Sequence, residues 1–305
     1  MTRWTTESIP AQHGRLAIVT GTGGLGYEDA LALARAGGDV ILAGRNAEKG
    51  AAAVARVRAE TPAATIRFEL LDLADLASIT AFGARMRAAL PRLDLLINNA
   101  AVMAPPDRQV TSDGFELQFG TNHLGHFALT AALLPLLRQS QNPRVISVAS
   151  LAARSGTIDF DDLQAARRYR PMAAYGQSKL ANILFALELQ RRSDAAGWGL
   201  ASIAAHPGIS HTDLITNGVG HNSPIGFAQR LLGPVLFQPA AQGALPTLFA
   251  ATAPDAAAGG YYGPDGLAEM RGFPGAANIP PQAADPRAAA RLWEVSAQLS
   301  GATFG

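Results

Sequence analysis

The chain has 305 residues, and its 25 Lys and Arg against 24 Asp and Glu give a formal net charge of +1. A balance this even gives no electrostatic reason to expect binding to nucleic acid or to an anionic membrane. The absence of Cys excludes disulfides, thiol catalysis and thiolate metal sites. Because no stretch resembles a linker between two cores, we expect one domain over residues 1–305.

Neither a signal peptide nor a membrane anchor is expected. Residues 1–10 contain charged side chains and lack an apolar core. The longest apolar run, residues 124–137, is interrupted by polar residues and by Pro135, and it is too short to span a bilayer. We therefore expect a cytoplasmic protein whose partners are small molecules.

Residues 16–20 form a β-branched run that leads into a Gly-rich turn and then into a helical pattern ending at residues 37–38. This order predicts a phosphate-binding loop, because glycines let the backbone approach a pyrophosphate and the helix start offers free N–H groups. An ordinary tight turn is the alternative. The residues predicted to contact the phosphates are Gly21, Gly23, Gly24, Leu25 and Gly26.

The second strand, residues 40–43, ends in Gly44, Arg45 and Asn46. An acidic residue here would bind the ribose 2′-hydroxyl of NAD, whereas Arg accommodates the 2′-phosphate of NADP. The sequence therefore favours NADP(H), with NAD(H) possible. The alternative is that Arg45 is a solvated charge that caps the next helix.

The alternation of strands and helices continues along the chain. Strands are expected over residues 65–70, 94–101, 144–148 and 200–205, and a long helix is expected over 113–137. Nearly unbroken apolar strands are typical of parallel sheets covered on both faces. We therefore predict an α/β fold, a Rossmann-like doubly wound parallel sheet of about seven strands with helices on both faces.

Polar residues follow these strands at the edge where open α/β sheets bind ligands. Asn98 and Asn99 end one strand, and Ser150 lies just beyond another. Each of these residues can also serve only to complete a turn. Asn122 lies inside a predicted helix, where Asn is mildly unfavourable, so either a functional role or a bond to nearby backbone is expected.

Tyr175 and Lys179 lie four residues apart in a predicted helix that extends to residue 192. At this spacing the two side chains share one face of the helix. The ammonium favours ionisation of the phenol, so Tyr175 is predicted to exchange a proton near neutral pH. Chance is a poor explanation because the chain has only 2 Lys and 5 Tyr. A buried Tyr beside a solvated Lys is the alternative.

The same helix is apolar on two sides, which we interpret as packing on the sheet and on a second subunit of a homodimer or homotetramer. Residues 210–242 are rich in Gly and Pro and are expected to form a substrate lid. No residues have the spacing of metal ligands, so no metal site is expected.

The Gly-rich turn, Asn122, Ser150, Tyr175 and Lys179 together resemble the short-chain dehydrogenase/reductase family over almost the full chain. Residues 158–163 and 174–182 resemble its retinol dehydrogenase and WW-domain oxidoreductase branch. The resemblance implies NAD or NADP as cofactor and, for this branch, carbonyl/alcohol pairs on hydrophobic molecules as substrates. It also implies a catalytic tetrad of Asn122, Ser150, Tyr175 and Lys179.

Further cofactor contacts are implied by the resemblance alone. They run from the adenine pocket, along the adenosine ribose, to the nicotinamide. Besides Tyr175 and Lys179, the positions in this order are Asp72, Leu73, Asn99, Ala100, Pro207, Ile209 and Thr212.

The chain departs from the family pattern in its Gly-rich turn, which is one residue shorter than the usual Thr-Gly-x-x-x-Gly-x-Gly. The shortened turn still offers amides to phosphate but lacks a residue that in the family can help hold the 2′-phosphate. The family's Asn-Asn-Ala-Gly is Asn98-Asn99-Ala100-Ala101 here, which adds a methyl group near the cofactor.

These observations predict an NADP(H)-dependent oxidoreductase that interconverts a carbonyl and an alcohol on a hydrophobic small molecule. Tyr175 would carry the proton, Ser150 would hold the reacting oxygen, and Lys179 would lower the pKa of the phenol. Asn122 would position a water that relays protons to solvent. The alternative is a catalytically silent NADP-binding sensor or scaffold.

Overall fold

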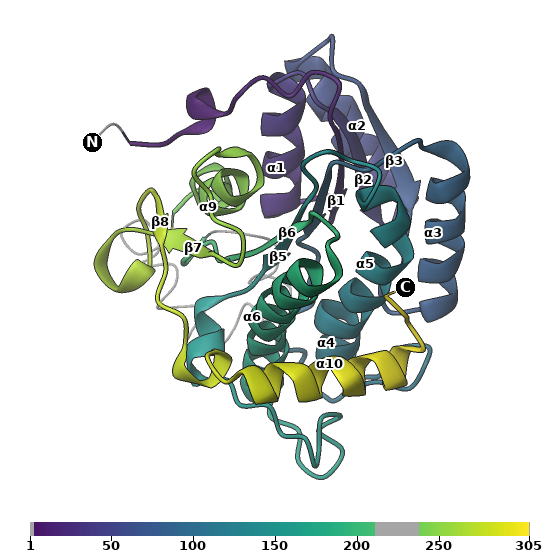
Figure 1. The fold of residues 1–305 in the computed structure, drawn as a ribbon, viewed down its shortest axis with the longest axis vertical. Coiled ribbons are helices and arrows are strands. Elements are labelled where there is room, and N and C mark those ends of the chain that lie inside the picture. The colour runs from purple at the N-terminus through teal and green to yellow at the C-terminus, as the bar shows by residue number, and fades with distance from the viewer. Residues whose placement is uncertain (1–2, 211–237, 305) are drawn as a thin grey trace.

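The computed structural model describes residues 3–210 and 238–304. Thr212 and most of the predicted lid, residues 211–237, lie outside the described residues. The described chain forms three layers, in which helices cover both faces of one central sheet (Figure 1).

The sheet of the described chain has eight strands in the order β3-β2-β1-β4-β5-β6-β7-β8. The predicted parallel sheet of about seven strands is confirmed by β1 to β7, and β8 pairs antiparallel with β7 at the edge. β8 was not expected because it is short and contains Pro and Gly, which are tolerated mainly at sheet edges. The bounds are β1 Leu16–Thr20, β2 Asp39–Gly44, β3 Ile66–Leu70, β4 Leu95–Asn98, β5 Arg144–Val148, β6 Ala201–Ala205, β7 Tyr261–Pro264 and β8 Pro274–Ala276.

Helices connect most of the strands. The α-helices are α1 Gly24–Arg35, α2 Ala47–Glu60, α3 Leu76–Ala89, α4 Leu117–Phe119, α5 Gly125–Leu137, α6 Pro171–Ala196, α9 Ala240–Thr252 and α10 Pro286–Ser300. The short helical turns are η1 Thr6–Ser8, η2 Gly120–Leu124, η3 Leu151–Ser155, η4 Leu267–Glu269 and η5 Pro281–Ala283.

The strands are buried on both faces because the helices divide between them. Val19 and Ile97 belong to one buried cluster with α1, α2 and α9. Their neighbours Ile18 and Leu96 belong to a second cluster with α3, α5 and α10 on the opposite face. Successive side chains of a strand point to opposite faces, so burial of both faces explains the unbroken apolar runs in the sequence.

The helix expected over residues 113–137 is shorter and less regular than predicted. It begins at Leu117, because residues 110–116 turn back through a bridge between Val110 and Glu116. Its segment Gly120–Leu124 is a π-helical turn that contains Asn122. Such turns are rare and occur frequently at functional sites.

The helix predicted to contain Tyr175 and Lys179 begins at Pro171, since Pro is well suited to the first turn of a helix. This helix, α6, is buried on two sides within one chain. One side packs on the sheet, and α10 covers another, where Phe185 stacks on Trp293 with 5.8 Å between ring centroids. Double burial of α6 is therefore satisfied without a second subunit, and the homo-oligomer stays a prediction. Among the described residues, no helix combines the length and apolar character needed to span a membrane.

Removing the carboxyl of Asp29 in α1 is expected to stabilise the fold. Asp29 is fully buried, and neither of its carboxyl oxygens has a hydrogen-bond partner among the described residues. Burial raises the pKa of Asp29 well above its ordinary value, with a further contribution from Glu28. The folded chain therefore keeps a proton on Asp29 that the unfolded chain releases, and the wild-type free energy of unfolding falls as the pH rises above the pKa of an unfolded Asp.

We expect Asp29→Ala to raise the free energy of unfolding by about 1 to 3 kcal/mol, the cost of an unsatisfied buried polar group. The gain should be larger at pH 8 than at pH 4. Urea unfolding at the two pH values measures this, and an equal or negative change at both would contradict it.

Candidate active site

The sheet order reverses between β1 and β4, which are neighbours although the chain passes from β1 to β2. In open α/β sheets, ligands bind at this switch point, beyond the carboxyl ends of the strands. Here the Thr20 hydroxyl oxygen accepts hydrogen bonds from the backbone N–H groups of Asn99 and Ala100, each at 2.9 Å. The segments that follow β1 and β4 are thus held against each other at the crevice.

The Gly-rich turn is closely packed despite its missing residue. Gly21 has a φ of +96°, which favours glycine, and a Cβ on Gly26 would lie 2.5 Å from the Gly21 carbonyl oxygen. Gly23 precedes the first residue of α1 and offers no side-chain cap. The first N–H groups of α1 therefore have no partner within the helix and are available to an anion.

A cavity of about 300 Å³ lies beside this turn. It extends from the end of β2 to the π turn that carries Asn122. Five predicted cofactor residues line it, namely Gly21, Arg45, Asp72, Leu73 and Ala100. The lining does not include the tip of the turn or the start of α1, which are formed by Gly23, Gly24, Leu25 and Gly26.

Two cations line the end of this cavity near β2. Arg45 and Lys49 are both exposed, and neither forms an ion pair with another described residue. Asn46, not Arg45, caps α2, because its side chain accepts from the Lys49 backbone N–H at 2.9 Å. Sequence reasoning missed Lys49, although it is one of only two lysines in the chain.

The polar side chains beside the cavity are engaged by the protein. Asn99 Nδ2 donates to the Thr20 carbonyl at 2.8 Å, and Asn98 Nδ2 donates to Thr130 Oγ1 at 3.0 Å. Asp72 Oδ1 accepts from the Ala74 N–H at 2.9 Å. Both Asn side chains therefore link the carboxyl end of β4 to other elements, Asn99 to β1 and Asn98 to α5.

Three of the four predicted tetrad residues come together beyond the carboxyl end of β5. Ser150 follows β5 and forms a side-chain hydrogen bond with Tyr175. The Lys179 Nζ lies 5.8 Å from the centre of the Tyr175 ring and donates to the Val148 carbonyl at 3.0 Å. Tyr175 and Lys179 are both buried. A phenol, a hydroxyl and an ammonium thus share one enclosed site.

The pKa values of this site differ from the prediction. Burial raises the pKa of Tyr175 to about 12, and the hydrogen bond with Ser150 offsets only part of this. Burial also lowers the pKa of Lys179 to about 7. The expected lowering of the phenol's pKa is therefore not found, because desolvation disfavours the phenolate more than its neighbours favour it.

Asn122 lies next to this group and joins two segments. Its Oδ1 accepts from the Val102 N–H at 2.8 Å, and its Nδ2 donates to the Val102 carbonyl at 2.9 Å and to Ser178 Oγ at 3.0 Å. The Asn122 carbonyl pairs with His126 Nδ1 at 3.0 Å. The Asn122 side chain therefore fixes the segment after β4 against α6.

Pro207 and Ile209 lie in the turn that follows β6. The Pro207 carbonyl accepts from Ser210 Oγ at 2.9 Å, and the Ile209 N–H donates to the Met270 carbonyl at 2.7 Å. This turn is thus tied to the segment between β7 and β8, which sequence reasoning did not connect with the site.

A doubly wound sheet with a Gly-rich crevice and an adjoining Ser, Tyr and Lys defines a nucleotide-binding oxidoreductase. Comparison with known proteins identifies the family, because the family model described as short chain dehydrogenase matches residues 15–221. The chain belongs to the short-chain dehydrogenase/reductase family. It is an enzyme of the class that uses NAD(P) to act on alcohol and carbonyl groups of small molecules.

The relatives extend over nearly the whole chain. Retinol dehydrogenase 13 of Homo sapiens is 43% identical over 295 residues, which cover 94% of this chain and 85% of that protein. Polyprenol dehydrogenase of Mus musculus is 41% identical over 304 residues, covering 97% and 87%. A crystal structure of an uncharacterized protein from Mycobacterium paratuberculosis has a TM-score of 0.82 and 40% identity, with 100% of both chains covered.

Proposed function

We propose that this enzyme uses NADP(H) to interconvert a carbonyl and an alcohol on a hydrophobic small molecule, with Tyr175 as the acid/base. The observation that carries the proposal is the meeting of Ser150, Tyr175 and Lys179 beyond β5, in the sheet whose switch point holds the nucleotide crevice. A silent binding protein would need the crevice but not this enclosed group of proton-exchanging side chains.

The preference for NADP(H) rests on the two cations that line the cavity. Arg45 and Lys49 follow β2, where a ribose 2′-phosphate is accommodated in this fold. Neither side chain is neutralised by a described acid, so both charges are available to a phosphate. The close approach of Gly21 and Gly26 and the free start of α1 suit the pyrophosphate of the same cofactor.

Each tetrad residue has a role that fits its surroundings. When bound, the dinucleotide supplies or accepts the hydride. Tyr175 donates the proton to the substrate oxygen during reduction, and a raised pKa keeps the phenol protonated for this step. Ser150 holds the same oxygen. Lys179 bonds the nicotinamide ribose, and Asn122 fixes the segment after β4 and relays protons through a water.

The substrate class is proposed from the named relatives. Retinol and polyprenol, the alcohols in their names, are both largely apolar molecules with a single hydroxyl. We propose apolar primary or secondary alcohols and the corresponding carbonyls as substrates. The homodimer or homotetramer and the cytoplasmic location remain proposals from the sequence.

The test is a fluorescence titration with NADPH and NADH, followed by a panel of apolar alcohols, aldehydes and ketones. We expect tighter binding of NADPH and cofactor-dependent turnover of at least one carbonyl/alcohol pair. Tight binding of NADPH without turnover of any pair would favour the silent binding protein, and turnover with NADH alone would reject the cofactor assignment.

Arg45→Ala is expected to weaken NADPH binding by about 1.5 to 3 kcal/mol, which is the contribution of a hydrogen bond to a charged group. NADH affinity should stay unchanged, because Arg45 is exposed and its loss leaves no buried group unpaired. Titration of both cofactors measures the difference.

Arg45→Lys is the matched control, since it keeps the charge but not the paired N–H donors, and it should lose less. Lys49→Gln tests the second cation in the same way. Equal loss of NADPH and NADH affinity in Arg45→Ala would refute the role of Arg45.

A further inference from the structure

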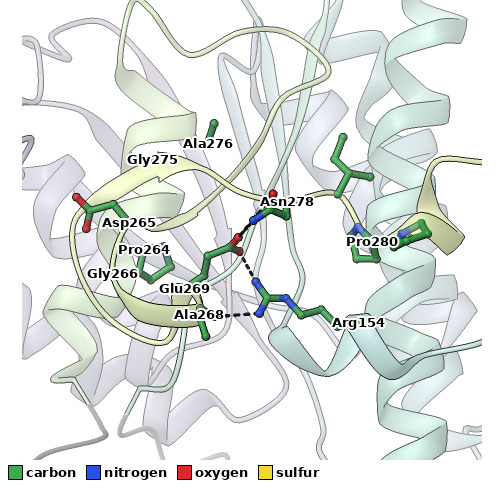
Figure 2. Close-up of a pocket in the computed structure, with 12 residues that line it drawn as sticks. Arg154, Pro264, Asp265, Gly266, Ala268, Glu269, Gly275, Ala276, Asn278 and Pro280 are labelled. Atoms are coloured by element: carbon green, nitrogen blue, oxygen red, sulfur yellow. Dashed lines mark hydrogen bonds and ion pairs between the residues drawn. The ribbon is translucent and has the colours of Figure 1, made fainter.

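Glu269 lies at the centre of a polar network beyond the ends of β5, β6 and β7. Its Oε2 accepts from the Arg154 guanidinium at 2.7 Å and from His206 Nε2 at 2.9 Å. Its Oε1 accepts from Asn278, at 3.0 Å from the backbone N–H and at 2.6 Å from Nδ2 (Figure 2). Arg154 and His206 lie far from Glu269 in sequence, whereas Asn278 is a near neighbour.

In this network Glu269 is ionised and His206 is neutral at neutral pH. Burial raises the pKa of Glu269, but the bonds from Asn278 and His206 and the charge of Arg154 outweigh burial and leave the pKa below its ordinary value. Burial lowers the pKa of His206 to about 4, although Glu269 opposes this. At neutral pH a carboxylate therefore accepts from a neutral imidazole and from a charged guanidinium.

The network joins two loops. One carries Ser150, which is proposed to hold the substrate oxygen, and the other is the turn at residues 206–209, which is expected beside the nicotinamide. Arg154 lies in η3, the helical turn that Ser150 caps through a 3.2 Å bond from the Ala152 N–H. His206 directly precedes Pro207, and its Nδ1 accepts from the Gly208 N–H at 3.2 Å. Glu269 therefore bonds both to the loop that presents Ser150 and to the turn expected beside the nicotinamide.

The backbone around Glu269 reinforces the same connection. The Met270 carbonyl accepts from the Ile209 N–H, and a Cβ on Gly208 would lie only 2.3 Å from that carbonyl oxygen. Ala268 and Glu269 have φ of 51° and 59°, which is unfavourable for residues other than Gly. Such conformations persist where surrounding contacts enforce them. Here, Arg154 also donates to the Ala268 carbonyl at 2.9 Å.

We propose that Glu269 is a positioning residue, which sets the distance between the Ser150 loop and the turn at residues 206–209 and thereby places the substrate for hydride transfer. The inference rests on the proposed function of Ser150 and of that turn. A displacement of about 1 Å at a reacting centre can lower the rate about 100-fold, so a modest shift between these loops has a large effect.

The test compares Glu269→Gln with Asp265→Asn. Both changes remove one negative charge from the same cavity of about 730 Å³. Asp265 accepts from the Phe273 N–H within its own loop and contacts neither Arg154 nor His206 in the described chain. The measured quantities are the Kd for NADPH and the rate constant and amplitude of NADPH oxidation in a single turnover with the best carbonyl substrate.

For Glu269→Gln we expect a hydride-transfer rate constant about 10 to 100 times lower, with full amplitude and a Kd for NADPH within about threefold of wild type. A purely structural role would lower the amplitude, through the folded fraction, and leave the rate constant unchanged. Asp265→Asn should match wild type in all three quantities.

Arg154→Met provides a second variant in case Glu269→Gln does not fold, because the Arg154 side chain is 39% exposed. It should also lower the rate constant, and Arg154→Lys should restore part of it. If folded Glu269→Gln and Arg154→Met keep the wild-type rate constant, the positioning role is overturned. Failure of the wild-type enzyme to turn over any pair would instead overturn the proposed function.

Discussion

Replacing Tyr175 with Phe is expected to lower kcat by about 10²- to 10⁴-fold, the usual contribution of a positioned general acid or base. The loss should appear in kcat and kcat/KM together, because the phenol acts on the substrate oxygen only as the proton moves. Tyr175 is 5% exposed, and Phe fills the same space, so the fold should be retained. Steady-state assays with the best carbonyl substrate measure the change.

The Kd for NADPH distinguishes a chemical role from a binding role. Tyr175→Phe should bind NADPH about as tightly as wild type, since its pairing with Ser150 is the one side-chain hydrogen bond that it loses in the described chain. Ser150→Ala should lower kcat as well, and the double variant should lose less than the sum, because both groups act on one oxygen. Full turnover by folded Tyr175→Phe would show that another group carries the proton.

Much of the site could be predicted because two rules place residues before any packing is known. Ligands bind at the carboxyl ends of parallel strands, which places Ser150 at the edge of the sheet. Helical periodicity places Lys179 one turn from Tyr175. The structure brings these three residues together as expected.

The features that were missed depend on tertiary contacts. Lys49 lies on the exposed face of α2, and only its place in the cavity lining gives it a role. Glu269 follows a Gly- and Pro-rich segment without periodicity, and its partners Arg154 and His206 are 115 and 63 residues away in sequence. No local pattern encodes contacts of this kind.

The pKa prediction failed for a related reason. Spacing showed that Lys179 lies near Tyr175, but spacing does not report burial, and burial is the largest cause of both shifts. A buried ammonium is itself destabilised, so it is a weaker source of positive charge at neutral pH than an exposed one. The same burial has a consequence for the stability of the whole chain.

Lys179→Met is expected to stabilise the cofactor-free protein while it abolishes most of the activity. The pKa of Lys179 is about 7 in the folded chain against 10.5 for an unburied Lys. Between these pH values the unfolded chain binds a proton that the folded chain does not, so wild-type stability rises with pH across this window. Below about pH 7, the difference between the two pKa values lowers the free energy of unfolding by at most about 5 kcal/mol.

Met removes this cost but also the 3.0 Å bond to the Val148 carbonyl, so we expect a net gain of about 2 to 4 kcal/mol at pH 6, after about 1 kcal/mol for the lost bond. The gain should disappear near pH 10, where the remaining cost of the buried lysine has fallen to about that of the lost bond. Urea unfolding of the cofactor-free protein at pH 6, 8 and 10 measures it.

Lys49→Met is the matched control, because it removes the other lysine of the chain from an exposed position. Its unfolding free energy should follow the wild-type pH dependence, whereas that of Lys179→Met should be flatter. Parallel curves for Lys179→Met and wild type would mean that the buried ammonium carries no such cost. If the curves do diverge, a residue kept at an energetic cost is one retained for activity rather than for folding, which is the trade-off expected of an active-site lysine.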